Sequence, residues 1–221
     1  MFSIKICGIT NVKDGQLAAL AGADAIGLNF YEDSPRFVNA EIAGKLSQVV
    51  PAKVQRVGLF VNAAAELINQ HCEALRLDFI QLHGDEPPEF LAELCDVPIV
   101  RAFRFGGDNM DEIAAYLDAC SRAPTAVLID AKIEGEFGGT GEAVDWESLA
   151  AAKEQLGDMP LVLAGGLDPF NVEEAVETVR PSAVDTASGV ESKAGSKDPM
   201  LMRAFVNAAK RALQALQADG T

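Results

Sequence analysis

Short apolar runs rich in β-branched residues alternate along the whole chain with longer segments in which apolar residues recur at helical spacing. The short runs predict eight β-strands, at 3–7, 25–30, 55–61, 79–83, 98–104, 125–130, 160–164 and 183–188. The amphipathic segments predict eight helices, at 12–21, 40–50, 63–75, 87–95, 110–120, 146–156, 172–179 and 199–217. Strands joined by helical crossovers run parallel and bury both faces, which explains why several of these runs are almost wholly apolar.

Eight such units in 221 residues predict a single-domain α/β fold, a (β/α)8 TIM barrel over residues 1–217 with a frayed tail at 218–221. The alternative is a doubly wound open sheet, which carries a glycine fingerprint after its first strand. That fingerprint is missing after residues 3–7, and no linker rich in Pro, Gly and Ser divides the chain. One domain therefore accounts for the whole length.

The composition suits a folded core, since 49% of the residues are apolar and 23% are charged. With 33 Asp and Glu against 18 Lys and Arg, the net charge is −15. A chain this acidic repels nucleic-acid phosphates and anionic lipids, so we expect no nucleic-acid and no membrane partner. No apolar run approaches the roughly 18 to 20 residues that span a bilayer, and no signal-peptide pattern precedes the first strand. We therefore expect a cytoplasmic protein.

The four cysteines lie far apart and form no pattern typical of a disulfide framework or a structural metal site. Three of them, Cys72, Cys95 and Cys120, stand in helical segments, where small buried thiols are ordinary. Cys7 differs because it ends the first predicted strand.

In a (β/α)8 barrel the loops after the strand ends build the active site, so polar residues there are the first candidates for catalysis. Cys7 shares strand parity with Lys5, whose ammonium group would favour a thiolate able to act as base or nucleophile. The alternative is a small apolar filler. Asp130 shares parity with Leu128, so it would project from the inner wall, where burial favours a general acid. Its alternative role is a cap for the next loop.

Glycines follow the last two predicted strands, as Gly165-Gly166 and Ser188-Gly189. In (β/α)8 barrels these loops often hold a phosphate on backbone N–H groups and on the N-terminus of a short extra helix. Tight turns are the alternative interpretation. The glycine-rich stretch 135–141, which includes Gly139, makes the loop after Asp130 long, as in a lid or a flexible linker.

Arg36 follows Ser34-Pro35 and is a candidate for binding a substrate carboxylate, with a surface arginine as the alternative. His83 ends the fourth predicted strand and is either a hydrogen-bonded strand-end residue or a catalytic group. The other histidine, His71, lies in a predicted helix, where we expect it to be solvated.

Seven short motifs stand in order near the predicted strand ends: Lys5–Thr10, Ser34–Arg36, Arg56–Asn62, Gln81–Gly84, Leu128–Asp130, Gly138–Gly141 and Asp185–Glu191. Together they closely resemble the phosphoribosylanthranilate isomerase family, and the resemblance spans nearly the whole chain. It implies a single-domain barrel of tryptophan biosynthesis. The implied reaction is an Amadori rearrangement of N-(5-phosphoribosyl)anthranilate to 1-(2-carboxyphenylamino)-1-deoxyribulose 5-phosphate, without cofactor or metal.

The resemblance also implies roles for individual residues. Asp130 would be the general acid that opens the sugar ring, and Cys7 the base that removes the proton from sugar C2. Arg36 would bind the anthranilate carboxylate, with His83 as a further substrate contact. The phosphate would lie on Gly165, Gly166, Ser188 and Gly189, and the loop containing Gly139 would close over the site.

Two departures from the family pattern lie on the phosphate side. Ala164 stands where many members carry Ser, and residues 193–198 lack the expected Pro-Gly. A related isomerase, the aminoimidazole carboxamide ribonucleotide enzyme, performs the same rearrangement, but its internal repeat and paired acids are missing here. A non-catalytic barrel that binds a phosphate ligand is the other alternative. Both a monomer and a homodimer remain open.

The implied substrate is an anion, so the net charge of −15 opposes its approach. We therefore predict a locally positive mouth, formed by Lys5, Arg36, Lys132 and the amides of the last two glycine turns.

Overall fold

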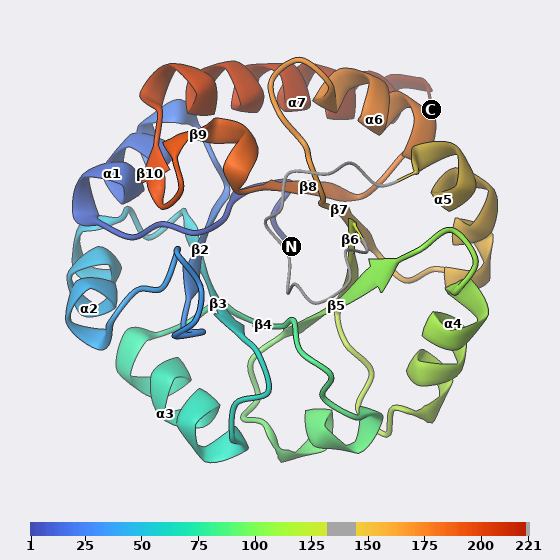
Figure 1. Cartoon of the computed structure of the whole chain (residues 1–221), viewed down its shortest axis with the longest axis horizontal. Helices are drawn as coiled ribbons and strands as arrows, with labels where there is room; N and C mark the ends of the chain where they lie inside the picture. Colours follow the sequence, from blue (N-terminus) through green and yellow to red (C-terminus); the bar gives the residue numbers. More distant parts are fainter. Residues whose placement is uncertain (132–144, 220–221) are drawn as a thin grey trace.

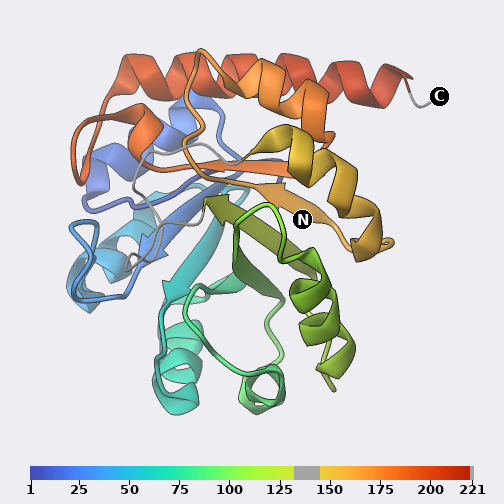
Figure 2. The ribbon, with the colours of Figure 1, turned by 45° about the vertical axis from the view of Figure 1, so that its right-hand side comes forward.

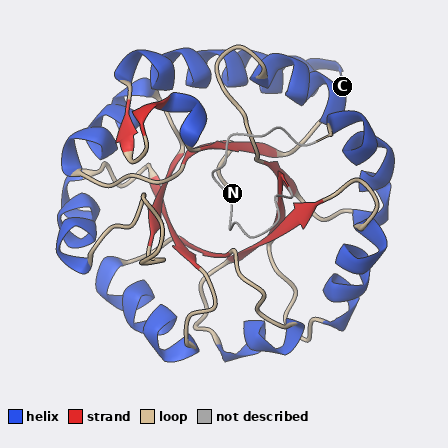
Figure 3. Cartoon of the chain, in the orientation of Figure 1, coloured by secondary structure: helices blue, strands red, loops and turns tan. Residues whose placement is uncertain are grey.

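Eight parallel strands close into a barrel surrounded by helices in a computed structural model that describes residues 1–131 and 145–219 (Figures 1 and 3). The predicted (β/α)8 barrel is confirmed. The strands are β1 Ile4–Ile6, β2 Ala25–Asn29, β3 Gln55–Phe60, β4 Phe79–Leu82, β5 Ile99–Phe105, β6 Ala126–Ala131, β7 Leu161–Leu163 and β8 Ala183–Thr186. The α-helices are α1 Val12–Ala21, α2 Ala40–Val49, α3 Ala65–Leu75, α4 Met110–Ala119, α5 Trp146–Ala152, α6 Val172–Val179 and α7 Pro199–Asp219.

Three of the predicted α-helices differ clearly in kind or length. The segment predicted at 87–95 is a 3₁₀-helix, η1 Pro88–Glu93, because a stretch of six residues that begins at the second of two prolines is too short for a stable α-helix. Helix α5 ends early and continues as a second 3₁₀-helix, η2 Lys153–Leu156. At the chain end, α7 continues two residues beyond its predicted end.

A small hairpin after β8 was not predicted. The short 3₁₀-helix η3 Ser188–Val190 leads into β9 Glu191–Lys193, which pairs antiparallel with β10 Ser196–Lys197. Both strands are too short to show an alternating pattern. Gly195 makes the turn possible with φ +74°, and a Cβ atom there would lie 2.7 Å from the Pro35 carbonyl oxygen.

The barrel interior is layered. Alternate residues point inward, and the layers nearest the N-terminal ends of the strands are apolar. They are formed by Phe2, Ala25, Val57, Phe79, Val100, Ala102, Ala126, Leu128, Val162, Ala164 and Ala183. The next inward positions are buried polar residues, Lys5, Gln81, Asp130 and Asp185. The interior therefore turns polar toward the C-terminal ends of the strands.

A larger apolar cluster lies between the strands and the surrounding helices. Helix α7 packs against α6 and α1, and Figure 2 shows it extending along one side of the barrel. Across the parts of the chain that the structure describes, no helix combines the length and the apolarity needed to cross a membrane.

Candidate active site

A cavity of about 630 Å³, including its open mouth, lies at the C-terminal ends of the strands. Its lining contains seven of the nine predicted site residues, Cys7, Arg36, His83, Asp130, Gly165, Gly166 and Ser188. Gly189 is not part of this lining, and a Cβ atom there would collide with the Leu167 carbonyl oxygen. Gly139, the glycine-rich stretch around it and Lys132 lie outside the described residues.

Cys7 directly follows β1 and is held between two neighbouring strands. Its backbone N–H donates to the Thr186 carbonyl oxygen at 2.8 Å. Gly27 on β2 leaves room for its side chain, since a Cβ atom on Gly27 would lie 2.6 Å from the Cys7 sulfur. Burial raises the pKa of the Cys7 thiol above 9.0, although the nearby Lys5 and Lys197 ammonium groups oppose the shift. The predicted thiolate is therefore not the resting state at neutral pH.

Lys5 belongs to the floor of the site. Its ammonium group donates to Asp185 Oδ2 at 2.6 Å and to Gln81 Oε1 at 2.8 Å, and the side chain has no solvent exposure. Burial disfavours the charge, but Asp185 outweighs this effect and raises the pKa of Lys5. The prediction that Lys5 helps to form a positive mouth is wrong, because its inward-facing position in the middle of the first strand, β1, places it below the cavity.

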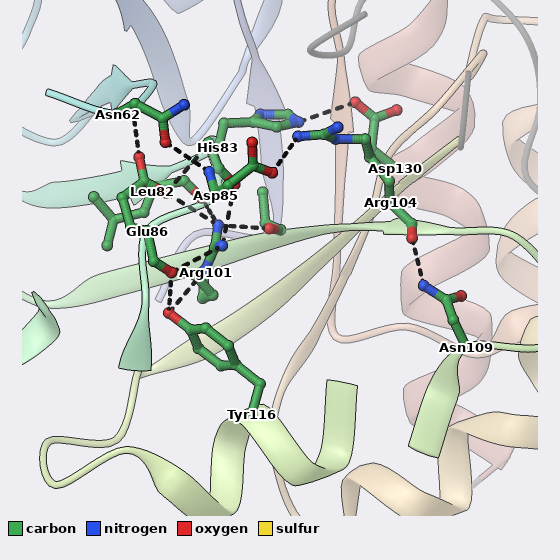
Figure 4. Close-up of polar contacts among 12 residues, drawn as sticks. Asn62, Leu82, His83, Asp85, Glu86, Arg101, Arg104, Asn109, Tyr116 and Asp130 are labelled. Atoms are coloured by element: carbon green, nitrogen blue, oxygen red, sulfur yellow. Dashed lines mark hydrogen bonds and ion pairs between the residues drawn. The ribbon is translucent and has the colours of Figure 1, made fainter. Parts of the chain in front are cut away.

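Asp130 and His83 face each other across the inner wall from β6 and from the end of β4. His83 Nε2 lies 3.3 Å from Asp130 Oδ2, and both side chains are buried (Figure 4). His83 Nδ1 contacts the Gln81 side-chain amide at 3.0 Å. On β5, Arg104 is the register partner of Asp130 and forms an ion pair with Asp85. Asp130 therefore projects into the cavity, as its strand parity predicted, with an imidazole as its neighbour.

Buried contacts of one arginine, Arg101, hold the end of β4 in place (Figure 4). Arg101 donates to the backbone carbonyl oxygens of Leu82 and Gly84 and to the Tyr116 hydroxyl. Glu86 accepts from the backbone N–H of Gly84 and forms an ion pair with Arg101 at 3.3 Å. These contacts fix the backbone on both sides of His83, so the position of its imidazole is set by buried hydrogen bonds.

Arg36 lies at the mouth of the cavity in a cluster of three charged side chains. Its Nε and Nη2 donate to the two carboxylate oxygens of Glu191 at 3.0 and 2.9 Å. Lys197, on β10, donates to the same carboxylate at 2.8 Å and is buried. The stem of Arg36 packs over Gly8, where a Cβ atom would lie 2.6 Å from Arg36 Cδ. With two cations and one anion, this cluster of three side chains has a net positive charge.

The two glycine turns meet beside the cavity. Gly165 and Gly166 both adopt positive φ, at +79° and +66°, a conformation that other residues rarely adopt. Thr186 ties the turns together, because its hydroxyl donates to the Leu167 carbonyl oxygen at 2.6 Å. Ser188 begins the short helix η3, as in a phosphate site of a (β/α)8 barrel.

Several of the residues that complete the site were not predicted from the sequence: Gly27, Gln81, Asp185, Glu191 and Lys197. The alternation of β4 offered a signal for Gln81, since it shares inward parity with His83. Likewise, Asp185 shares parity with buried Ala183. No local signal marks Lys197, which approaches the site only because the β9–β10 hairpin folds back.

His71, predicted to be solvated, is half-buried, because one side of its ring packs on the protein. Its ring lies 4.5 Å from that of Phe30 and 5.8 Å from that of Phe60, measured between centroids. His71 Nδ1 contacts the Leu67 carbonyl oxygen at 2.8 Å. This histidine therefore packs on the outside of the barrel, away from the cavity lining.

Among residues 1–131 and 145–219, no group of three or more His, Cys, Asp or Glu side chains is arranged to hold a metal ion. The chemistry that the described cavity lining offers is that of two carboxyl groups (Asp130 and Asp185), an imidazole, a thiol and one guanidinium group.

A family model described as N-(5'phosphoribosyl)anthranilate (PRA) isomerase matches residues 4–208. The N-(5'-phosphoribosyl)anthranilate isomerase of Geobacter metallireducens is 46% identical over 211 residues, covering 95% of this chain and 100% of the relative. The enzyme of Pseudomonas aeruginosa is 47% identical over 212 residues, covering 94% of each.

Solved structures agree with these relatives. The phosphoribosyl anthranilate isomerase of Thermotoga maritima superposes with a TM-score of 0.85 at 35% identity, covering 96% of this chain and 100% of that one. A phosphoribosyl anthranilate isomerase in complex with reduced 1-(o-carboxyphenylamino)-1-deoxyribulose 5-phosphate superposes with a TM-score of 0.82 at 34% identity, with the same coverage. The chain therefore belongs to the N-(5'-phosphoribosyl)anthranilate isomerase family.

Proposed function

We propose that this protein converts N-(5-phosphoribosyl)anthranilate into 1-(2-carboxyphenylamino)-1-deoxyribulose 5-phosphate in tryptophan biosynthesis, with Asp130 as general acid and Cys7 as general base. The assignment of the acid and the base rests on one observation. A carboxyl group on β6 and a thiol at the end of β1 line the same cavity, next to two glycine turns suited to a phosphate. A sugar phosphate held at those turns presents its ring to both groups.

Ring opening is the first step. The Asp130 carboxyl group gives its proton to the furanose ring oxygen, and the bond between sugar C1 and that oxygen breaks with its electron pair passing to the oxygen. The lone pair of the anilino nitrogen forms a C=N bond to C1, which yields an iminium ion. The Asp130 carboxylate that results faces His83 at 3.3 Å.

Proton removal follows. Cys7 acts in its thiolate form, which is the minor form at neutral pH because burial raises the pKa of the thiol. The thiolate takes the proton from sugar C2, the C–H electron pair forms a C1=C2 bond, and the iminium electrons return to nitrogen. The enol-amine then loses its hydroxyl proton and gains one at C1, which gives the amino-ketone. Since burial raises the pKa of Cys7, the cations Lys5 and Lys197 act here by stabilising the thiolate. Electrons and atoms balance without an external oxidant or reductant.

The remaining contacts hold the two anionic ends of the substrate. Arg36 binds the anthranilate carboxylate through the guanidinium donors that its ion pair with Glu191 does not use. The phosphate lies on Gly165, Gly166 and Ser188, with Gly189 allowing the close approach of the two turns. The closure of the loop containing Gly139 and the contribution of Lys132 stay predictions.

Two substitutions test the roles. Cys7→Ala and Asp130→Asn should each lower turnover by about 10² to 10⁴, followed as loss of substrate fluorescence, with an unchanged circular dichroism spectrum. Cys120→Ala and Asp108→Asn are matched controls outside the cavity lining and should retain wild-type turnover. Full activity of either cavity variant would overturn the assignment.

We also propose that the protein acts in the cytoplasm on this small-molecule substrate, without a nucleic-acid partner and as a monomer or homodimer. The net charge of −15 supports the absence of a nucleic-acid partner. The Thermotoga maritima enzyme is described as dimeric, and sedimentation equilibrium would measure the oligomeric state of this protein directly.

A further inference from the structure

A row of buried polar side chains crosses the barrel from β8 to β6 along the floor of the cavity. Asp185 accepts from Lys5 at 2.6 Å, Lys5 donates to Gln81 at 2.8 Å, Gln81 contacts His83 at 3.0 Å, and His83 faces Asp130 at 3.3 Å. All five side chains are buried. The row therefore connects the neighbour of the base, Lys5, to the proposed general acid.

The direction of the three hydrogen bonds that join Asp185, Lys5, Gln81 and His83 is fixed by the ammonium group, whereas His83 and Asp130 are close but not hydrogen-bonded in this structure. Lys5 has only donors, so the atom of Gln81 that faces it must be the carbonyl oxygen, Oε1. The amide nitrogen of Gln81 then faces His83 Nδ1. An amide NH₂ group also has only donors, so His83 Nδ1 must accept and carries no proton. The proton of the neutral imidazole is therefore on Nε2, the atom that faces Asp130.

A second proton on this imidazole is disfavoured by the same contact. The imidazolium ion would place an Nδ1–H group against the Gln81 amide, and two buried donors would then face each other. The charged groups around the imidazole are Asp130 on β6, Arg104 on β5, and the pair of Lys5 and Asp185 on β1 and β8. Arg104 is ion-paired with Asp85, and Lys5 with Asp185.

We propose that Gln81 is a positioning residue that holds His83 in the Nε2–H tautomer, so that a neutral donor faces the Asp130 carboxyl group. This inference rests on the proposed role of Asp130 as general acid. An imidazolium ion at this place would favour the ionised form of Asp130 before the substrate binds. Asp130 would then have no proton to donate to the sugar. A neutral N–H donor leaves Asp130 able to hold its proton, and it stabilises the carboxylate once that proton has passed to the sugar. Such contacts are often long in an empty site and shorten in the substrate complex.

The tautomer can be observed directly by nitrogen-15 NMR of the imidazole rings. The chain has only two histidines, and a His71→Asn variant assigns their signals. His71 is an internal contrast, because its Nδ1 contacts a carbonyl oxygen and must carry a proton. In the wild type we expect the neutral rings to carry their protons on opposite nitrogens, with His83 protonated on Nε2 and His71 on Nδ1 at about pH 8. A neutral His83 ring protonated on Nδ1 would overturn the proposal.

Two matched variants test the part played by Gln81. Gln81→Glu keeps the shape and the acceptor for Lys5 but presents an oxygen to His83 Nδ1, so this nitrogen should become protonated. Asn29→Asp adds the same charge to the same cavity from β2, where the amide contacts Ser34 and Tyr31 instead of His83. It should leave the His83 tautomer unchanged. Gln81→Glu with the wild-type tautomer, or Asn29→Asp with an altered one, would overturn the assignment to Gln81.

Kinetics give an independent measure. We expect kcat of Gln81→Glu to fall by about tenfold to a hundredfold with a smaller change in KM, which is less than the loss from removing the acid itself. A change of tautomer with unaltered kcat would overturn the catalytic part of the proposal. If the wild type failed to convert phosphoribosylanthranilate, the proposed function would be wrong. The tautomer assignment would still be tested by the NMR spectrum alone.

Discussion

Gly27 and Cys7 lie on neighbouring strands so close together that a Cβ atom on Gly27 would come within 2.6 Å of the Cys7 sulfur and 2.9 Å of its Cα atom. The position of the Cys7 thiol in the cavity therefore depends on Gly27 of β2 having no side chain. Because part of this contact involves backbone, a rotamer change of Cys7 cannot relieve it.

Gly27→Ala should displace Cys7 and lower kcat at least tenfold, since overpacking at this position moves the base away from its substrate. The free energy of unfolding should fall by about 1 to 3 kcal/mol, as for other overpacked cores. Urea denaturation and the fluorescence assay measure the two effects. Gly44→Ala is the control, because no described atom outside its own helix backbone and chain neighbours lies within 4 Å of its Cβ position in α2. That substitution should raise stability by about 0.5 to 1 kcal/mol without altering activity. Wild-type kcat in Gly27→Ala would contradict the packing argument.

The pH dependence of Cys7 follows from its burial. Its pKa is raised above 9.0, so alkylation by iodoacetamide should reach half its maximal rate above pH 9.0. Lys197→Met removes a cation that lowers this pKa, and the midpoint should move to still higher pH. Each cysteine lies on a different tryptic peptide, so mass spectrometry follows Cys7 separately.

Two internal references belong to this measurement. Lys193→Met removes an exposed charge from the same hairpin and should leave the Cys7 midpoint unchanged. Burial and Cys95 raise the pKa of Cys72 to about 12, so its peptide should remain unmodified where Cys7 reacts. A Cys7 midpoint below pH 9.0 would show that the cations outweigh burial.

Glu191 should contribute stability that is lost in acid. Burial opposes its charge, but Arg36 and Lys197 outweigh this effect and hold the pKa of Glu191 below 4.5. An acid whose pKa is lower in the folded chain stabilises it above the unfolded value, and this contribution disappears as the pH falls through the folded value. Glu191→Gln should therefore lower the free energy of unfolding by roughly 3 kcal/mol at pH 7, because two cations lose a buried partner.

The difference between Glu191→Gln and wild type should shrink as the pH falls below 4.5, which urea denaturation at several pH values measures. Glu41→Gln is the matched control, because Glu41 pairs with Lys45 on the exposed face of α2 and contributes little. A difference that stays constant down to acid unfolding would contradict the linkage.

The hydroxyl of Tyr116 should stabilise the end of β4. It accepts from Arg101 Nε at 3.1 Å and donates to the Glu86 carbonyl oxygen at 2.9 Å. Tyr116→Phe should cost about 1 to 2 kcal/mol, since Arg101 loses a buried acceptor. Hydrogen exchange at the Gly84 amide should accelerate, whereas exchange at the Leu163 amide in β7 should change only as far as the free energy of global unfolding falls. Equal acceleration at both amides would show that the hydroxyl has no local role.

The order of strands and helices was readable from the sequence because local pattern determines it. Inward-facing residues of a parallel barrel strand alternate with residues that face the helices, and the predicted strands agree with the observed ones to within two residues at each end. The 3₁₀-helix η1 and the β9–β10 hairpin escaped prediction because a run of two to six residues contains too few positions to establish a period.

Strand ends also pointed to Cys7, Asp130, His83 and the glycine turns, because closure of a barrel brings the carboxyl ends of all strands to one mouth. The sequence thus determined the fold, the family resemblance and the identity of these strand-end groups. Only the tertiary structure decided their surroundings: that burial raises the pKa of Cys7, that Lys5 lies in the floor, and that Glu191 and Lys197 join Arg36. The physical reason is distance along the chain. Hydrogen bonds such as those from Lys5 to Gln81 and Asp185 join residues 76 and 180 positions apart, and no local pattern encodes which of the inward side chains will meet.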